Sequence, residues 1–407
     1  MHCQPQPLLG DSYRQQWVLW RYGHIYGTSA NAIFLTREKH NTNNDDDDDD
    51  DEISIFSLVR ECFGNIAGLV TGLLFLLLIK ATLVAQLSKV GVLLQSNILF
   101  LPFLNRGAWT ILFSFAVTAV FTVGKKCHIE RINDVLTSTM LLSFASLIAL
   151  AGRSGWTIDG LKRANYNSLL PSKLVASPWV APIFIQLLLF NEVVPLVSTK
   201  LGDETKVRRA IVYGSSIPLL MCVIWSCVAL GIVPYEPATL VTTATSGSSS
   251  AIYDPLSRLS ERAISKGGSI GKIFLTSVNT MAGSAICTTV FGSILATTQY
   301  LDDVIVTLFG ARRNDKSKTK LFKYAFAIFP SAIVASLGSS ELYYRATAFA
   351  GEFPCTFVFG FIPPLCNLRL RWNRREHGGT NQWKEITAQI FLAVVSVVIL
   401  AACRLSK

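Results

Sequence analysis

The sequence predicts an all-α integral membrane protein with about nine transmembrane helices. The chain has 407 residues, of which 50% are hydrophobic and only 16% are charged. A typical soluble domain contains about 25% charged residues. Apolar stretches long enough to cross a bilayer alternate along the chain with short charged clusters, and the mean hydropathy is +0.40. These observations exclude a soluble α/β enzyme, a disordered regulator and a secreted disulfide scaffold.

Length and polarity define each of the expected spans. They cover residues 66–88, 108–124, 135–151, 176–197, 210–233, 270–296, 322–338, 342–365 and 386–403. The seventh span is short and contains Pro330, which predicts a bend. Any other backbone must lie outside the hydrocarbon or line a cavity within the protein, because lipid cannot satisfy its hydrogen bonds.

Residues 1–52 differ from the rest of the chain. The segment is polar and ends in a run of adjacent acidic residues, from Asp45 to Glu52. Because adjacent like charges repel and cannot pack, we expect a disordered, solvated tail at 1–52 and a multi-pass membrane domain at 53–407. Calcium binding by the run is a weaker alternative, since it lacks the glycine turn and spaced ligands of a calcium loop. An organelle transit peptide stays open.

The charges of the loops predict the orientation. The loops after spans two, four, six and eight contain more Lys and Arg than the alternate loops do, as in Lys316, Lys318, Lys320 and Lys323 between spans six and seven. The richer set is expected on the cytoplasmic or stromal side, together with the acidic tail. On short loops between lipid spans such clusters do not indicate nucleic acid, and no nucleic-acid partner is expected.

Residue types that carry enzyme chemistry are scarce. The nine cysteines and five histidines show no CxxC or Cys/His spacing of a zinc site, so the cysteines are interpreted as packing residues. The sequence contains no phosphate-loop motif. We therefore expect no metal, no cofactor and no enzymatic activity.

Span four contains the most informative residues, because Asn191 and Glu192 lie near mid-membrane depth, just before Pro195. A charged side chain at a helix centre costs on the order of 2.5–3.5 kcal/mol on insertion scales. Proline removes a backbone donor and disfavours helix at the preceding residue. A helix broken beside a polar pair is typical of transporter binding sites at the bilayer midplane. A kinked helix with Glu192 paired to a Lys or Arg is the alternative.

Three other spans contain polar or helix-breaking residues. Span six includes the small and hydroxylated stretch 284–292, which favours either close helix packing or ligand contact. Lys80, inside the apolar first span, either snorkels to the interface or pairs with Glu192. The stretch 351–354 in span eight, Gly-Glu-Phe-Pro, predicts a second helix discontinuity.

Several of these stretches resemble the tryptophan/tyrosine permease family, the aromatic amino acid permeases. The most specific block runs from Pro182 to Leu219 and includes the stretches 190–195 and 206–219. Residues 288–292 resemble the Thr-Ser-Phe-x-Gly of the family's eighth helix, and residues 345–351 with 359–363 resemble its tenth. The resemblance extends from about residue 54 to 403 and is closest to plant and algal members.

The resemblance implies the inverted-repeat fold of the amino acid–polyamine–cation superfamily, with a substrate site between broken first and sixth helices. Carried over by position, the break of the sixth helix falls on Phe190, Asn191 and Glu192, and the eighth-helix contribution falls on Thr288 and Thr289. Glu192 is then the candidate ion-coupling residue. The family usually has His-Asn or His-Gly where this chain has Asn191-Glu192.

The function expected from the resemblance is secondary active transport of tryptophan- or tyrosine-like amino acids. We expect this transport to be coupled to protons or to another cation. We also expect alternating access around the broken helix near 189–195. The nine spans correspond to helices three to eleven of the family, and the first two are not recognisable. A truncated relative that binds a ligand or partner without transport is therefore the alternative. The plastid envelope and other cellular membranes are both open as locations.

Overall fold

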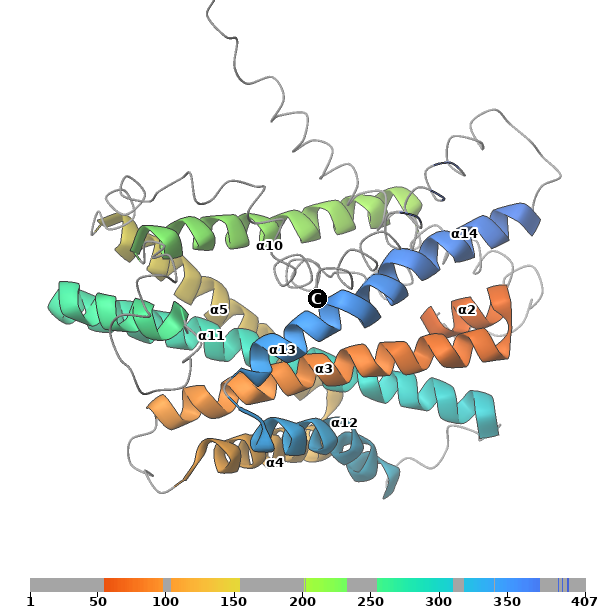
Figure 1. Ribbon diagram of the computed structural model, residues 1–407, viewed down its shortest axis with the longest axis horizontal. Coiled ribbons are helices and arrows are strands. Elements are labelled where there is room, and N and C mark those ends of the chain that lie inside the picture. The colour runs from red at the N-terminus through yellow and green to blue at the C-terminus, as the bar shows by residue number, and fades with distance from the viewer. Residues whose placement is uncertain are drawn as a thin grey trace, which may run out of the picture. The chain divides into compact units, whose positions relative to one another are not determined.

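The computed structural model describes residues 55–97, 104–153, 201, 203–232, 255–309, 318–339 and 341–373, and the single positions 387, 390 and 394. Helices dominate these ranges, and no strand occurs within them. The elements, labelled in Figure 1, are α2 (Ile55–Phe63), α3 (Asn65–Asn97), α4 (Arg106–Val123), α5 (Lys126–Arg153), α10 (Glu204–Ile232), α11 (Pro255–Phe309), α12 (Lys318–Leu337), α13 (Leu342–Ala350), the π-helix η4 (Gly351–Phe361) and α14 (Ile362–Asn373).

Seven helical segments in the described part of the chain are long and apolar enough to cross a membrane. They are Asn65–Ser96, Arg106–Val123, Cys127–Gly152, Thr205–Ala229, Gly268–Asp302, Lys320–Leu337 and Leu342–Leu370. Each overlaps one of the spans expected from the sequence, so seven of those spans are confirmed as helices. The expected spans at 176–197 and 386–403 lie outside the described residues. The protein is thus an all-α, multi-pass integral membrane protein.

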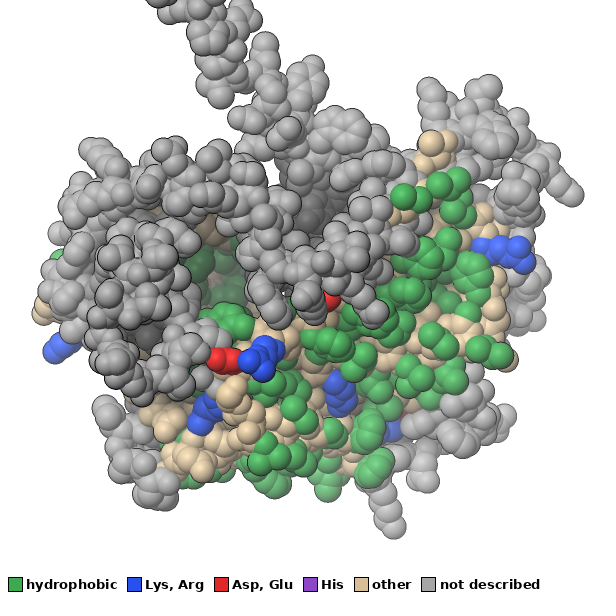
Figure 2. Space-filling model, in the orientation of Figure 1, with side chains coloured by type: hydrophobic (Ala, Val, Ile, Leu, Met, Phe, Trp, Pro, Cys, Tyr) green, Lys and Arg blue, Asp and Glu red, His purple; other side chains and the backbone are tan. Residues whose placement is uncertain are grey.

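The surface of the described helices is apolar. Large hydrophobic side chains such as Leu142, Leu337 and Phe322 are exposed. On the face of the molecule drawn in Figure 2, hydrophobic side chains are spread over the described surface, with few charged side chains among them. In water such a surface promotes aggregation, whereas in a bilayer it meets hydrocarbon.

Two helix breaks occur at glycines, at positions where the sequence analysis predicts no break. Gly64, with φ +90°, lies between α2 and α3, and its N–H donates to the carbonyl of Arg60 at 2.8 Å. Gly268, with φ +49° and ψ −118°, interrupts α11. Because residues with a side chain rarely adopt positive φ, glycine is the residue that allows both breaks. The membrane-spanning part of α11 accordingly begins at Gly268.

The chain divides into two compact units. The first comprises residues 1–77, 181–219 and 351–407, and the second comprises residues 78–180 and 220–350. In the first unit α2 packs on α14, and the rings of Phe75 and Phe359 meet edge to face with centroids 6.2 Å apart. The Cys62 thiol lies 3.9 Å from the carbonyl oxygen of Cys366.

Two helix pairs form most of the second unit. The core between α5 and α11 contains Leu147, Ala151, Phe274 and Val278, joined by Val228 from the end of α10. Helix α12 lies beside α4 (Figure 1). Aromatic rings connect the two pairs, because Phe121 of α4 lies 5.0 Å from Phe291 of α11 and 5.3 Å from Tyr324 of α12, centroid to centroid.

Close contact between backbones fixes the position of α4. A Cβ atom at Gly91 of α3 would lie 2.7 Å from the carbonyl oxygen of Arg106, and one at Gly107 would lie 2.8 Å from that of Ser336 in α12. The buried hydroxyl of Thr110 donates to the carbonyl of Leu87 at 3.3 Å. Small residues permit this approach, and in lipid the resulting contacts replace the hydrophobic effect as the source of association.

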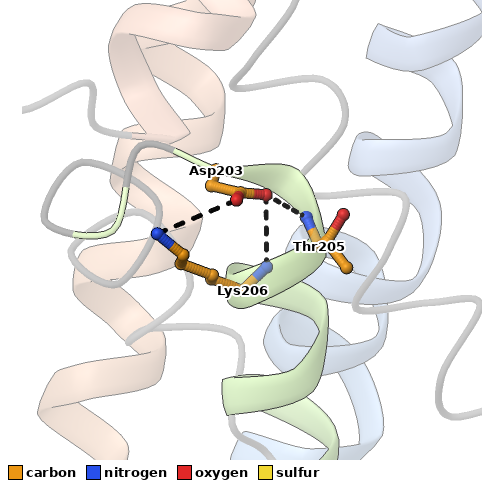
Figure 3. A network of polar contacts seen from close by, with 3 residues as sticks. All are labelled: Asp203, Thr205 and Lys206. Atoms are coloured by element: carbon orange, nitrogen blue, oxygen red, sulfur yellow. Dashed lines mark hydrogen bonds and ion pairs between the residues drawn. The ribbon is translucent and has the colours of Figure 1, made fainter.

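Asp203 caps the N-terminus of α10 (Figure 3). One carboxylate oxygen accepts the backbone N–H of Thr205 at 2.8 Å and that of Lys206 at 3.4 Å, while the Lys206 ammonium lies 3.9 Å from the other oxygen. These N–H groups, followed by the charge of Lys206, hold the pKa of the Asp203 carboxyl below its usual 3.8. The cap supplies acceptors to N–H groups that have no partner within the helix.

The contact at Gly91 predicts a sharp difference between two glycine substitutions. We expect Gly91→Ala to destabilise the protein by about 1–3 kcal/mol, because backbone atoms of α4 must move to admit the methyl group. Gly283→Ala in α11 is the matched control, since nothing lies within 4 Å of its Cβ position. The thermal midpoints of the purified proteins in detergent provide the comparison. Equal midpoints for both variants would contradict the close approach of α3 and α4.

The Asp203 cap predicts a pH-dependent first turn of α10. Because the pKa of the folded state is lowered, the carboxylate's stabilisation is present above the unfolded pKa and is lost as pH falls through the folded pKa, below 3.8. We expect amide-exchange protection at Thr205 and Lys206 to fall over that window and to be absent at all pH values in Asp203→Ala. Asp203→Asn keeps an acceptor oxygen, so it retains protection that does not vary there with pH. If protection in the parent protein varied with pH no more than in Asp203→Asn, the role of the Asp203 charge would be refuted.

Candidate functional site

The candidate site predicted from the sequence lies only partly within the described residues. Phe190, Asn191, Glu192 and the helix-breaking Pro195 are outside them, so the break in span four stays a prediction. Thr288 and Thr289 both belong to α11, as expected. The described part of the site is therefore the middle of α11 and the helices of the second unit that pack against it.

Thr288 and Thr289 share one hydrogen-bond acceptor. Each hydroxyl donates to the carbonyl oxygen of Ala285 at 2.9 Å. A hydroxyl has a single hydrogen and two lone pairs, so each oxygen keeps its capacity to accept a bond from a ligand. Both side chains are half-buried. The pair can therefore offer acceptors, such as an amino group requires, without leaving a hydroxyl hydrogen unsatisfied.

The two faces of α11 differ in burial around Thr288 and Thr289. Val290, Ile294 and Thr297 are buried on one side and follow the helical repeat. On the opposite side Thr288 is followed at four-residue spacing by Gly292, whose Cβ position has nothing within 4 Å. The buried face packs in the second unit, where Phe291 meets Phe121. Thr288 and Gly292 thus share a face with open space in this part of the structure.

Hydroxyl side chains along α11 repeat the same bonding pattern. Ser284 donates to the carbonyl of Thr280 at 2.7 Å, and Thr297 donates to that of Ser293 at 2.7 Å. Such bonds back to the preceding turn satisfy polar groups inside a membrane helix and bend it slightly. Packing alone explains Ser284 and Thr297, which are buried. Thr288 and Thr289 differ because they are more accessible.

Among the described residues, the hydrogen-bond partners of Lys80 are backbone carbonyls, and a pairing with Glu192 lies outside the described residues. Its ammonium donates to the carbonyl oxygens of Phe326, at 2.8 Å, and Ala327, both in α12. It also lies 5.2 Å from the centroid of the Phe326 ring. The sequence suggested a choice between the interface and Glu192, and missed α12. The available signal was Pro330, whose missing N–H frees the carbonyl of residue 326.

The discontinuity predicted at 351–354 is confirmed. In the structure Gly351–Phe361 forms a π-helix that contains Pro354. The buried Thr356 hydroxyl donates to the carbonyl of Gly351, five residues earlier, at 3.0 Å. Wide turns of this kind are rare and often lie at functional sites. Half-buried Phe353, Phe357 and Phe361 line up along η4, with successive centroids 6.3 and 5.3 Å apart.

An ion pair that the sequence did not predict joins the ends of α11 and α12. The Lys323 ammonium contacts the Asp302 carboxylate, and both side chains are partly exposed. Both residues stood out in the sequence separately, Asp302 after span six and Lys323 in the basic loop. Pairing them required knowing that the two helices lie side by side.

Comparison with known proteins assigns the family. The model of the tryptophan/tyrosine permease family matches residues 38–405, which includes every described helix and the predicted break in span four. No individual curated protein matches the chain. The match covers far more than half of the sequence and agrees with the membrane-spanning helices and with the stretches that resemble the family. The chain therefore belongs to the tryptophan/tyrosine permease family.

Proposed function

We propose that this protein is a secondary active transporter that carries tryptophan- or tyrosine-like amino acids across its membrane by proton coupling. The family match over residues 38–405 carries the proposal, since family membership implies transport of aromatic amino acids. The seven apolar helices support it independently, because a permease must span its membrane many times.

The proposed substrate site combines the predicted break in span four with α11. By resemblance to the family, Phe190, Asn191 and Glu192 are proposed to supply an aromatic ring, an amide and a carboxylate. Thr288 and Thr289 supply two hydroxyl oxygens with free lone pairs on a partly accessible face. An amino acid needs acceptors for its ammonium group, donors for its carboxylate and an apolar surface for its ring, and this set of residues contains all three.

The proposed coupling residue is Glu192. A carboxylate in a low-dielectric site is costly while it is ionised, so proton uptake and substrate binding can stabilise one another there. In this proposal the proton binds Glu192 from one side of the membrane and leaves to the other. Rocking of one helix bundle against another around the site at 189–195 provides alternating access. The inverted-repeat architecture expected for the superfamily belongs to the same proposal.

Counterflow in proteoliposomes tests transport directly. Vesicles loaded with unlabelled tyrosine are expected to accumulate external labelled tyrosine through the parent protein. Thr288→Val with Thr289→Val should reduce the rate about tenfold or more, because the site loses two acceptors. Thr280→Val is the matched control, since that exposed hydroxyl makes the same bond to the preceding turn, at 2.8 Å, outside the site. Absence of counterflow of both tyrosine and tryptophan by the parent would reject the function.

Replacing Glu192 by Gln tests the coupling. We expect Glu192→Gln to retain counterflow but to lose the dependence of net uptake on a pH gradient, because the amide does not titrate. Glu341→Gln is the control: Glu341 pairs with Arg345 at 2.7 Å at the start of α13 and should leave that dependence intact. Unchanged pH dependence in Glu192→Gln would remove Glu192 from the coupling step while leaving the transport function standing.

A further inference from the structure

Helix α12 contains a backbone carbonyl that lacks its regular donor within the helix. Pro330 lies inside α12 and has no N–H to donate to the carbonyl of Phe326, four residues earlier. A proline ring also crowds the carbonyl four residues earlier in a helix. Within a bilayer no water is available to take the place of the missing donor. A helix with proline at this position therefore benefits from a donor on another element.

Lys80 of α3 supplies such a donor. Its ammonium donates to the Phe326 carbonyl at 2.8 Å and to the neighbouring Ala327 carbonyl, and it lies over the Phe326 ring. Within the described part of the chain no carboxylate pairs with Lys80. An intramembrane lysine needs a partner, and backbone carbonyls are one of the few kinds available. The freed carbonyl and the intramembrane cation thus satisfy one another.

The contact between α3 and α12 runs in both directions. The Ser331 hydroxyl donates to the backbone carbonyl of Lys80 at 3.4 Å, and Ser331 is only 2% exposed. Ala327 and Ile328 are fully buried on α12, as are Leu78 and Leu83 on α3. Both helices thus have buried residues beside the lysine bonds, while the bond to Phe326 is exposed and the bond to Ala327 is partly buried. The two bonds and the Ser331 hydroxyl connect α3 to α12 within the second unit.

Arg106 serves the other end of α12 in the same way. Its guanidinium donates to the carbonyls of Ala335, at 3.4 Å, and of Gly338. The last carbonyls of any helix lack partners within that helix. Carbonyls beside Pro330 and at the C-terminal end of α12 thus both accept hydrogen bonds from cations of neighbouring helices. The repetition supports a structural role for each cation.

We propose that Lys80 acts as the missing hydrogen-bond donor of Pro330 and that the two residues form one energetic unit, which connects the proline-containing turn of α12 to α3. Lys80 is then a positioning residue, and its charge takes no part in carrying the coupling ion. The inference goes beyond the transport function and does not depend on it, because it concerns the stability of a junction inside the second unit.

A double-mutant cycle tests the unit. The proteins are the parent, Lys80→Met, Pro330→Ala and the double variant, each purified in detergent and compared by thermal midpoint. Methionine keeps much of the lysine side chain's bulk but donates no hydrogen bond. The alanine of Pro330→Ala restores a backbone N–H to the Phe326 carbonyl. We expect Lys80→Met to lower the midpoint by about 3 °C or more when Pro330 is present and by much less in the Pro330→Ala background.

Lys89→Met provides the matched control. Lys89 lies on the same helix as Lys80, and its ammonium is 6.0 Å from the centroid of the Tyr343 ring in α13. Its effect on the midpoint should be the same in both backgrounds. If Lys80→Met alone yields no folded protein, recovery of monodisperse protein from Lys80→Met with Pro330→Ala gives the same answer. An equal loss from Lys80→Met in both backgrounds overturns the proposal.

A second measurement separates a positioning role from a titrating one. In reconstituted vesicles, Lys80→Met with Pro330→Ala should retain the parental pH profile of tyrosine uptake. A double variant that is as stable as the parent but has lost that pH profile would show that Lys80 titrates during transport, and the proposal would then be wrong. The stability cycle decides the proposal even if tyrosine is not carried, so its failure and the failure of the transport function remain distinguishable.

Discussion

The absence of water inside a bilayer is the constraint on which this structure depends. Every backbone N–H and C=O in the hydrocarbon must find a partner within the protein. Long regular helices meet that requirement by themselves, and the described spans of α3, α4, α5 and α11 are largely of this kind. The positions where a regular helix fails are the demanding ones, because each of them needs a specific side chain or a different backbone geometry.

At the described positions where regular helical hydrogen bonding fails, the backbone groups are satisfied by a cation from another helix, by a change of helix type or by a carboxylate cap. At Pro330 a lysine from another helix supplies the missing donor. At the end of α12 an arginine does so. Around Pro354 the backbone changes to a π-helix, and Thr356 donates to the carbonyl of Gly351. At the aqueous end of α10, where water is available, Asp203 caps the first turn and a charged acceptor is inexpensive.

Much of the fold could be predicted because its signals are local. Hydrophobic stretches of the right length identified the spans from 66–88 to 342–365 that the structure describes, and Gly351 to Pro354 marked the irregular segment of span eight. The breaks at Gly64 and Gly268 were missed, since a glycine in an apolar stretch does not by itself reveal a positive φ. The ends of α11 were also missed, because the helix continues beyond the hydrocarbon into polar residues.

The candidate site was less predictable because its contacts are between distant residues. Thr288 and Thr289 were chosen by resemblance, and their shared acceptor, Ala285, follows from helix geometry once α11 is known. The partners of Lys80, Arg106 and Asp302 lie more than twenty residues away along the chain. No periodicity or composition identifies such partners. In the case of Lys80 the sequence held both halves of the answer, an intramembrane cation and a proline in another span, without indicating that they meet.

The bond from Lys80 to α12 has a consequence for how this family can vary. Lys80 contacts main-chain oxygens, which every residue possesses, so a substitution at residue 326 or 327 removes neither acceptor. What creates the demand for a donor is Pro330, which Lys80 does not bond. In related sequences the lysine should therefore appear and disappear together with the proline. Evolutionary coupling would then link positions 80 and 330, which are connected through the backbone carbonyl of residue 326.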